Sequence, residues 1–294
     1  MNLRNLINTS SAPERPYYEF NREERHLAGI LFFILNQPGI LERALTVLDC
    51  SWKINPKQFG IYLEYSYARD LWHAMNTKPI DLPAVNRRKS EAILQLLATA
   101  GEPVISAFSP VHHDVSTRDF NAFFVDEHRA SREYIQSPAN WNLKRLAENI
   151  PDNNEALAAA CRLKWAFRVK PDLVINIDNQ HALCLELKLE SIEGTYPASG
   201  AERKLLRDRK MYGSGLTFPM QQTKLQRFLM KEILGLECLS RFITRSGTVK
   251  PECISWSELL DSLNPLPDLP AYMQAALTHA RHNLLSPREV EEGE

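Results

Sequence analysis

The chain has 294 residues, of which 44% are hydrophobic and 24% charged, and its formal net charge at pH 7 is −1. These values are typical of a globular protein long enough for one large domain or two small ones. They exclude a field of the whole chain that would attract DNA, so any binding of a polyanion must depend on local basic patches.

The sequence also gives no indication of a membrane or secreted protein. The longest apolar run, residues 27–35, is too short to span a bilayer, and the first residues lack the apolar core of a signal peptide. The five cysteines are far apart and form no CxxC pair, a pattern typical of reduced thiols. We therefore expect a cytoplasmic protein with no membrane partner.

Helical spacing of apolar residues dominates the first hundred residues. Residues 1–20 are polar and interrupted by prolines, which predicts a loose arm. A helix is expected from Asn21 to Leu35, with Asn21 as its N-cap and Glu24 completing a capping box. Further helices are expected over residues 39–50, 57–76 and 84–100.

The middle of the chain has weaker patterns. PVISAF, at residues 103–108, is compatible with a short strand, and residues 111–119 with a loop. His112-His113-Asp114 lies in that loop, but no second ligand pair has metal-binding spacing, so a polar loop is expected. Helices are expected over residues 121–132, 139–148 and 152–163.

The last third of the chain predicts a β-hairpin at residues 172–190, followed by a charged linker at 191–204. An amphipathic helix over residues 220–235 ends at a glycine, which is a common helix stop. A strand over 241–248 and a helix over 255–263 follow. The chain then continues through prolines to an acidic end.

The hairpin carries the residues of greatest chemical interest. Side chains in a strand alternate between two faces, so Leu183, Leu185 and Leu187 share a core face. Glu186 and Lys188 lie on the opposite face. Turn-forming residues at 178–181 predict antiparallel pairing of the two strands, which would bring Asp172 close to Glu186 and Lys188.

Two carboxylates held close together either share a proton or share a cation. Mg²⁺ binds through one or two carboxylates and keeps water molecules for a phosphate ligand, and a nearby lysine can orient the attacking water. The alternative is an ordinary amphipathic strand whose Glu and Lys lie on a solvent-exposed face, where such pairs have little effect.

The pattern resembles the PD-(D/E)xK nuclease superfamily, with Pro171-Asp172 as the PD and Glu186-Leu187-Lys188 as the ExK. The resemblance implies an α/β fold with a restriction-endonuclease-like αβββαβ core, in which helices flank a small mixed sheet. Here the core would carry a large, mainly helical N-terminal elaboration. The expected nuclease domain covers residues 21–262, with a helical insertion at about 50–150, after the arm at 1–20 and before a C-terminal helix and acidic tail at 263–294.

The resemblance also implies roles for individual residues. Asp172, Glu186 and the backbone carbonyl of Leu187 would bind Mg²⁺ or Mn²⁺. Lys188 would position the attacking water. Glu24 would bind a second metal or anchor the first; the alternative for Glu24 is a partner in the helix cap.

Residues outside the motif receive weaker expectations. Many family members carry a glutamine or lysine on the helix after the hairpin that reaches the active site, and Gln222 is the first candidate here. The alternative for Gln222 is an exposed helical glutamine. Arg168, Lys170 and Arg203 are candidates for contacts with phosphate groups.

Together these features predict an Mg²⁺-dependent phosphodiesterase whose partner is a nucleic acid, DNA in preference to RNA. Analogy with the family suggests defence against foreign DNA and allows a homodimer. Two alternatives stay open. One is a non-catalytic nucleic-acid-binding or scaffolding protein of the same fold, and the other is a helical interaction module.

Overall fold

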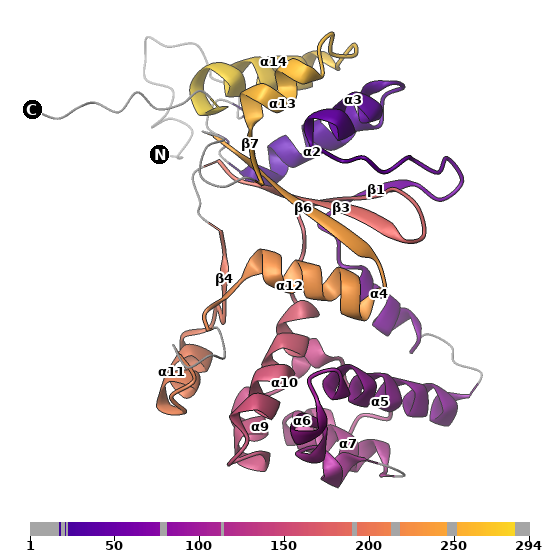
Figure 1. The fold of residues 1–294 in the computed structure, drawn as a ribbon, viewed down its shortest axis with the longest axis vertical. Helices are drawn as coiled ribbons and strands as arrows, with labels where there is room; N and C mark the ends of the chain where they lie inside the picture. Colours follow the sequence, from indigo (N-terminus) through magenta and orange to yellow (C-terminus); the bar gives the residue numbers. More distant parts are fainter. Residues whose placement is uncertain are drawn as a thin grey trace, which may run out of the picture. The chain divides into compact units, whose positions relative to one another are not determined.

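The computed structural model describes residues 18, 21, 23–76, 81–112, 115–189, 193–212, 218–245 and 252–285. These residues form two compact units (Figure 1). The first unit takes its described residues from Met1–Glu64, Asp172–Ile192 and Leu239–Glu294. The second takes them from Tyr65–Pro171 and Glu193–Cys238.

A mixed five-stranded sheet forms the centre of the first unit. Its strands follow the order β1-β2-β3-β6-β7, with bounds Gly60–Leu63, Leu173–Asn176, His181–Leu187, Glu237–Thr244 and Cys253–Ser255. The β1–β2 and β2–β3 pairs are antiparallel, whereas β6 and β7 are parallel. Leu173 pairs with Leu185 and Ile175 with Leu183, so the predicted hairpin and its leucine face are both confirmed.

Four helices cover the leucine face of this sheet (Figure 1). They are α2 (Glu24–Leu35), α3 (Ile40–Val47), α13 (Trp256–Ser262) and α14 (Ala271–Ala280). Ile34 of α2 and Leu259 of α13 are fully buried with Leu173 and Leu185 of the sheet in one apolar cluster. Burial of this apolar surface holds the helices on the sheet.

The other face of the hairpin differs from the expectation of a polar, half-exposed surface. Val174, Cys184 and Glu186 lie on it, with exposed fractions of 0%, 0% and 1%. The alternative of an amphipathic strand with a solvent-exposed face is therefore wrong for these residues, because all three are buried. Glu186 is a carboxylate in an environment where unpaired charges are costly.

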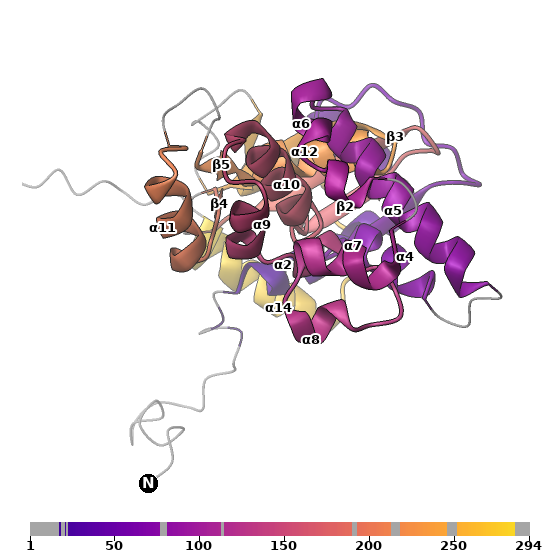
Figure 2. The ribbon, with the colours of Figure 1, turned by 90° about the horizontal axis from the view of Figure 1, so that it is seen from below.

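The second unit is mainly helical. Its helices are α4 (Tyr67–Ala74), α5 (Leu82–Ala98), α6 (Glu102–Ser106), α7 (Thr117–Phe124), α8 (Glu127–Ala130), α9 (Leu143–Asn149), α10 (Asn154–Ala166), α11 (Gly200–Asp208) and α12 (Gln222–Phe228). Figure 2 shows α5, α6, α7, α9 and α10 as neighbours. An aromatic core lies among them, in which Phe108 and Trp141 stack on Phe124 and the Phe120 ring is tilted against it. Strands β4 (Thr195–Tyr196) and β5 (Met220–Gln221) form a separate antiparallel pair.

Two of the predicted elements are wrong in type. The helix expected over residues 57–76 is strand β1 followed by α4, because Ile61 pairs with Ile175 at the edge of the sheet. The strand expected at PVISAF is helix α6. Gly101 before it has a φ of +104°, and Pro103 lies in its first turn, where proline favours helix initiation.

Other boundaries differ from the expected ones. Glu23, not Asn21, is the N-cap residue of α2, and the Asn21 side chain accepts from the Glu23 amide instead of capping the helix. The linker expected at 191–204 contains β4 and the start of α11. The helix expected over 220–235 is divided into β5, α12 and a π-helical turn at Leu229–Ile233. Most of the arm at 1–20 and the tail at 286–294 lie outside the described residues.

The expected domain over residues 21–262, with its insertion at about 50–150, stays a prediction. The division into units adds that residues 193–238 join the helices of residues 65–171. Over the described ranges, no single helix is long and apolar enough to cross a bilayer; α2 and α3 meet that criterion only as a pair, bent by 120°.

Candidate functional site

Lys188 is the centre of a charged cluster in the first unit. Its ammonium nitrogen lies 2.8 Å from Oε1 of Glu186 and 3.5 Å from Oε2 of Glu24. The exposed fractions of the three side chains are 13%, 2% and 26%, respectively. Glu24 comes from the start of α2, 164 residues earlier in the chain than Lys188. The fold therefore brings together three of the predicted site residues.

Glu24 is held by the end of the hairpin and does not cap its own helix. The amide of Leu189 donates to Oε1 of Glu24 at 3.0 Å, while α2 has no side-chain hydrogen bond at its N-cap. Of the two roles expected for Glu24, contact with the site residues is the one that the geometry supports.

Asp172 lies just before β2 and contacts β3 across the pair. Its Oδ2 accepts a hydrogen bond from the amide of Leu187 at 2.8 Å. Burial raises the pKa of Asp172 above its usual value, and the negative charges of Glu24 and Glu64 raise it further. The Leu187 amide and the Lys188 ammonium oppose this rise but do not cancel it.

Glu64 is a further carboxylate near the cluster, and no sequence pattern pointed to it. Glu64 follows β1, and its amide donates to the backbone oxygen of Asp172 at 2.9 Å. Its φ of +49° is unusual for a residue with a side chain, and its Oε1 accepts from Arg25 at 3.1 Å. A correct prediction of strand β1 would have indicated that Glu64 lies at the end of a strand, but the pattern over residues 57–76 predicted a helix.

Lys188 is fixed through its backbone as well as its side chain. Its amide donates to the carbonyl of Ile243 at 2.8 Å, and its own carbonyl accepts from the indole of Trp256 at 3.3 Å. Burial lowers the pKa of Lys188, but the neighbouring carboxylates, Glu186 first, raise it by more, so the net direction is upward. Lys188 is therefore protonated at neutral pH and acts as a hydrogen-bond donor rather than as a base.

The chemistry of these donors fits a divalent cation. Glu24, Glu64, Asp172 and Glu186 bring four carboxylates, whereas Lys188 and Arg25 bring two positive charges. Carboxylate oxygens are the hard ligands that Mg²⁺ prefers, and a cation would relieve the repulsion that raises the pKa of Asp172.

The spacing of the donors, however, does not form a complete set of ligands. Among the residues that the structure describes, no group of three or more His, Cys, Asp or Glu side chains is placed to hold a metal ion. Instead, the Lys188 ammonium contacts both Glu186 and Glu24. The role of the Leu187 carbonyl as a ligand stays a prediction.

The remaining predicted residues belong to the second unit. Gln222 is the first residue of α12, where its amide donates to the carbonyl of Gly194 at 2.9 Å. Its side chain lies so close to Gly194 that a Cβ there would meet Oε1 of Gln222 at 2.6 Å. Its predicted reach to the carboxylates stays a prediction.

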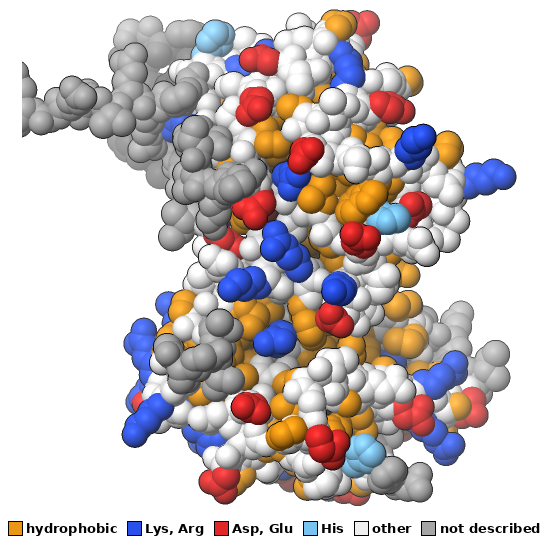
Figure 3. Space-filling model, viewed as in Figure 1, with side chains coloured by type: hydrophobic (Ala, Val, Ile, Leu, Met, Phe, Trp, Pro, Cys, Tyr) orange, Lys and Arg blue, Asp and Glu red, His pale blue; other side chains and the backbone are white. Residues whose placement is uncertain are grey.

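The three predicted phosphate-binding residues have different surroundings. Arg168 is exposed and donates from Nε to the carbonyl of Ala139 at 2.7 Å, and it lines a cleft. Arg203 donates to the carbonyl of Ala198 at 2.7 Å. Neither Arg203 nor Lys170 lines that cleft. Figure 3 shows basic and acidic side chains interspersed over the face in view.

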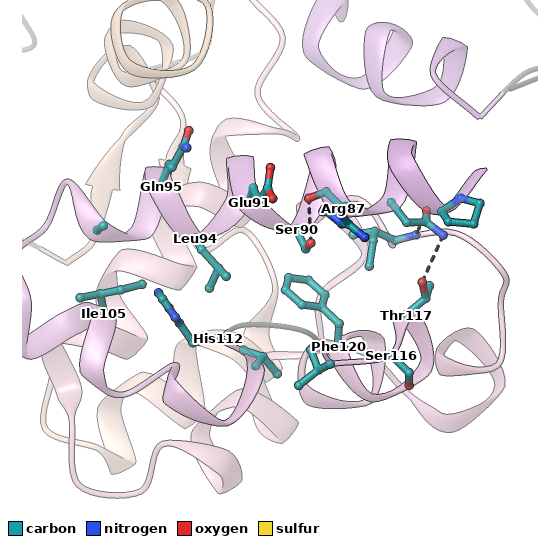
Figure 4. A pocket seen from close by; sticks show the side chains of 16 residues that line it. Arg87, Ser90, Glu91, Leu94, Gln95, Ile105, His112, Ser116, Thr117 and Phe120 are labelled. Carbon is teal, nitrogen blue, oxygen red and sulfur yellow. Dashed lines mark hydrogen bonds between the residues drawn. The ribbon is translucent and has the colours of Figure 1, made fainter. Parts of the chain in front are cut away.

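A separate pocket of about 570 Å³ lies among α5, α6 and α7 in the second unit. Figure 4 shows the side chains of Leu94, Ile105 and Phe120 beside the polar side chains of Glu91 and His112. None of the predicted site residues lines it. His112 is thus part of a pocket wall, while His113 and Asp114 lie outside the described residues.

Comparisons with protein-family models, with curated proteins and with solved structures found no match to this chain. The fold and the site define it as an α/β protein with a mixed five-stranded sheet and a partly buried cluster of carboxylates around one lysine. Inferences about function therefore depend on that cluster.

Proposed function

We propose that this protein is a metal-dependent nuclease that hydrolyses phosphodiester bonds, with DNA as its substrate. The observation that carries the proposal is the burial of Lys188 between Glu186 and Glu24. Asp172 in addition accepts a hydrogen bond from Leu187, the middle residue of the ExK. An ordinary strand edge has no physical reason to bury a carboxylate and an ammonium together, because the desolvation of both charges costs several kcal/mol.

The fold supports the same proposal. The PD and ExK residues occupy an antiparallel hairpin within a mixed sheet whose leucine face is covered by helices, an arrangement compatible with a restriction-endonuclease-like core. The preference for DNA, a role in defence against foreign DNA and a homodimeric state come only from the family resemblance, and we carry them as parts of the proposal.

In the proposed reaction, each residue has a role that its position supports. Asp172 and Glu186 would hold the divalent cation, which when bound polarises the phosphoryl oxygen and lowers the pKa of water. Lys188, being protonated, donates a hydrogen bond that orients the attacking water or offsets charge developing on the phosphoryl group. Glu24 keeps the Lys188 side chain in place. In the hydrolysis, the attacking water would lose a proton to solvent as its oxygen bonds to phosphorus, and the leaving oxygen would take up a proton from solvent as its bond to phosphorus breaks.

A cleavage assay tests the proposal. Purified protein is incubated with plasmid, linear DNA and RNA in Mg²⁺, in Mn²⁺ and in EDTA, beside Asp172→Asn, Lys188→Met and the control Asp178→Asn, whose carboxylate contacts His181 in the turn of the hairpin. We expect metal-dependent cleavage by the wild type and by Asp178→Asn, and loss of at least about 100-fold in the other two variants. Equal cleavage by all four proteins would indicate a contaminant and remove the proposal.

One observation favours a second candidate, a non-catalytic nucleic-acid-binding protein. In the described part of the chain the donors do not form a three-ligand metal site, and Lys188 neutralises part of their charge. Binding of DNA without cleavage in either metal would support this candidate over the nuclease.

A further inference from the structure

The second unit contains a cleft of about 680 Å³, and 11 of its 15 lining residues are polar or charged in type. It is formed by residues of α8, α9, α10 and α11 and of the turn at Pro138–Asn140. Five of its lining residues are cations and three are carboxylates. The cations are Arg129, Lys144, Lys164, Arg168 and Lys204, and the carboxylates are Asp126, Glu202 and Asp208.

Two of the three carboxylates are already engaged within the protein. Oε1 of Glu202 accepts from the buried ammonium of Lys164, and Oε2 accepts from the indole of Trp165. The carboxylate of Asp126 accepts from the side chain of Asn142. These contacts leave Asp208 as the single lining carboxylate without a recorded partner among the described residues.

Lys164 and Glu202 form the floor of the cleft and not its binding surface. Their side chains are only 4% and 15% exposed, and they join α10 to α11. Burial lowers the pKa of Lys164, which the Glu202 carboxylate partly offsets. The charges of Lys164 and Glu202 therefore offset each other at the floor of the cleft. The charge that a ligand encounters comes from the side chains at the rim.

The rim is positive. Lys144, Arg168 and Lys204 are exposed, and Arg129 is half-buried. Within the described ranges, Arg129, Arg168 and Lys204 form no ion pair, and the nearest carboxylate to the Lys144 ammonium is 4.0 Å away on Glu148. These cations lie on three helices, α8, α9 and α11, and in the turn after α10, so they can contact several anionic groups at once.

The start of α11 adds neutral donors to this positive rim. Ser199 caps the nine-residue helix, and Ser199, Ala201 and Glu202 line the cleft. The first turn of a helix presents free amide groups and the positive end of the helix dipole, which favour phosphate groups. Asn140 and Asn142 supply further polar contacts.

We propose that this cleft binds the phosphodiester backbone of DNA. The inference rests on the proposed function, because it takes a nucleic acid as the ligand. Among the described lining residues, Trp141 is the single aromatic one, and at 2% exposed it offers no surface for stacking of bases. Contacts from Arg and Lys to phosphate, without contacts to bases, hold a nucleic acid in place independently of its sequence.

Binding in the absence of metal tests the inference separately from cleavage. Affinity for a labelled DNA duplex is measured by fluorescence anisotropy in EDTA over a range of salt concentrations. The test variant is the full chain with Lys144→Glu and Lys204→Glu, which changes exposed side chains only. The matched control, Arg88→Glu with Arg118→Glu, changes the same charge on exposed residues of α5 and α7 in the same unit.

We expect the cleft variant to bind at least about 10-fold more weakly than the control at 0.1 M salt. The slope of log affinity against log salt should fall in magnitude by ~1.8, because two phosphate contacts are lost. Equal affinity and slope in the two variants would overturn the inference. A cleft variant that loses affinity for a free nucleoside triphosphate but not for DNA would also overturn it, because the ligand would then be a nucleotide.

The two proposals fail in different ways. If DNA binding depends on the cleft but no metal supports cleavage, the nuclease proposal fails and the cleft stands. If cleavage requires Asp172 and Lys188 but reversal of the cleft charges leaves binding unchanged, only the cleft assignment fails. Thermal unfolding of both double variants checks that neither has lost its fold.

Discussion

The ammonium nitrogen of Lys188 and Oε1 of Glu186 lie 2.8 Å apart, and both side chains are almost completely buried. Arg25 and Glu64 form a second ion pair in the same unit, with 3.1 Å between Nε and Oε1, but their side chains are 75% and 36% exposed. Solvent screens the second pair and not the first. The two pairs therefore provide an internal comparison between a buried and an exposed charge interaction.

Replacing Lys188 by methionine should destabilise the protein. The Glu186 carboxylate would lose its closest recorded cation while remaining buried, at a cost of about 3 kcal/mol in the free energy of unfolding. Arg25→Met should cost less than about 1 kcal/mol, because its pair is exposed. Urea denaturation at pH 7 measures both.

The double variant Glu186→Gln with Lys188→Met removes both charges and should recover part of the lost stability. If Lys188→Met were no less stable than Arg25→Met, the buried pair would not be the constraint that its geometry indicates.

Replacing Asp172 by asparagine should increase stability at neutral pH in EDTA while it abolishes cleavage. The pKa of Asp172 in the folded protein is raised above its usual value, chiefly by burial. Between the unfolded pKa and the higher folded pKa of Asp172, the folded state binds more protons than the unfolded state. The free energy of unfolding therefore falls as pH rises through this range, and at pH 7 it stays below its value at acidic pH as far as Asp172 contributes. The side-chain oxygen of asparagine can still accept a hydrogen bond from the Leu187 amide, and it carries no negative charge.

Denaturation of the wild type and Asp172→Asn from pH 3.5 to pH 7 checks the sign of this effect. The advantage of the variant should grow with pH and then level off. An advantage for the wild type at pH 7 in EDTA would contradict the prediction.

Mg²⁺ should stabilise the wild type against thermal unfolding. At a concentration ten times the dissociation constant, the expected gain is about 1.4 kcal/mol. Asp172→Asn and Glu186→Gln should show little or no gain. Asp178→Asn is the control, because Asp178 lies in the turn of the same hairpin and contacts His181 instead of the cluster. An equal gain in all four proteins would place the cation elsewhere.

Lys89 provides a pH-dependent contribution to stability in the second unit. Its side chain is buried, its ammonium donates to the carbonyl of Trp72 and the side chain of Asn76, and burial lowers its pKa to about 8. Between pH 8 and the unfolded value near 10.5, the unfolded state binds more protons. Stability should therefore rise with pH in that range.

Comparison with Lys89→Met isolates this contribution. The difference in unfolding free energy, wild type minus variant, should increase by about 2 kcal/mol from pH 7 to pH 10. A difference that stays constant over this range would mean that Lys89 keeps an ordinary pKa in the folded protein.

Local patterns were sufficient to predict the hairpin and the residues that it brings together. Alternation of leucines identified its core face, and the turn at residues 178–181 determined which residues meet across the strands. Asp172, Glu186 and Lys188 could therefore be grouped from the sequence alone. Glu24 was included because of a family resemblance, and its contact with Lys188 depends on packing between segments far apart in the chain.

Other features depend on tertiary structure that no short window contains. Strand β1 has four residues and lies at the edge of the sheet, so its pattern is too short to distinguish from a helix. Glu64 reaches Asp172 only because β1 pairs with β2. The burial of Glu186 likewise could not be predicted, since alternation with leucines suggests that the opposite face is exposed to solvent.

The chain passes between its two units four times, after residues 64, 171, 192 and 238. The first unit is therefore built from three separate segments and the second from two, and any continuous fragment that contains all of the second unit also contains residues 172–192 of the first. During synthesis, α2 and α3 are translated before α13 and α14, with which their apolar faces pack. Those faces lack these partners until residues 256–280 have been translated, so chaperone binding to α2 and α3 on the nascent chain is the natural point at which to study the folding of the first unit in the cell.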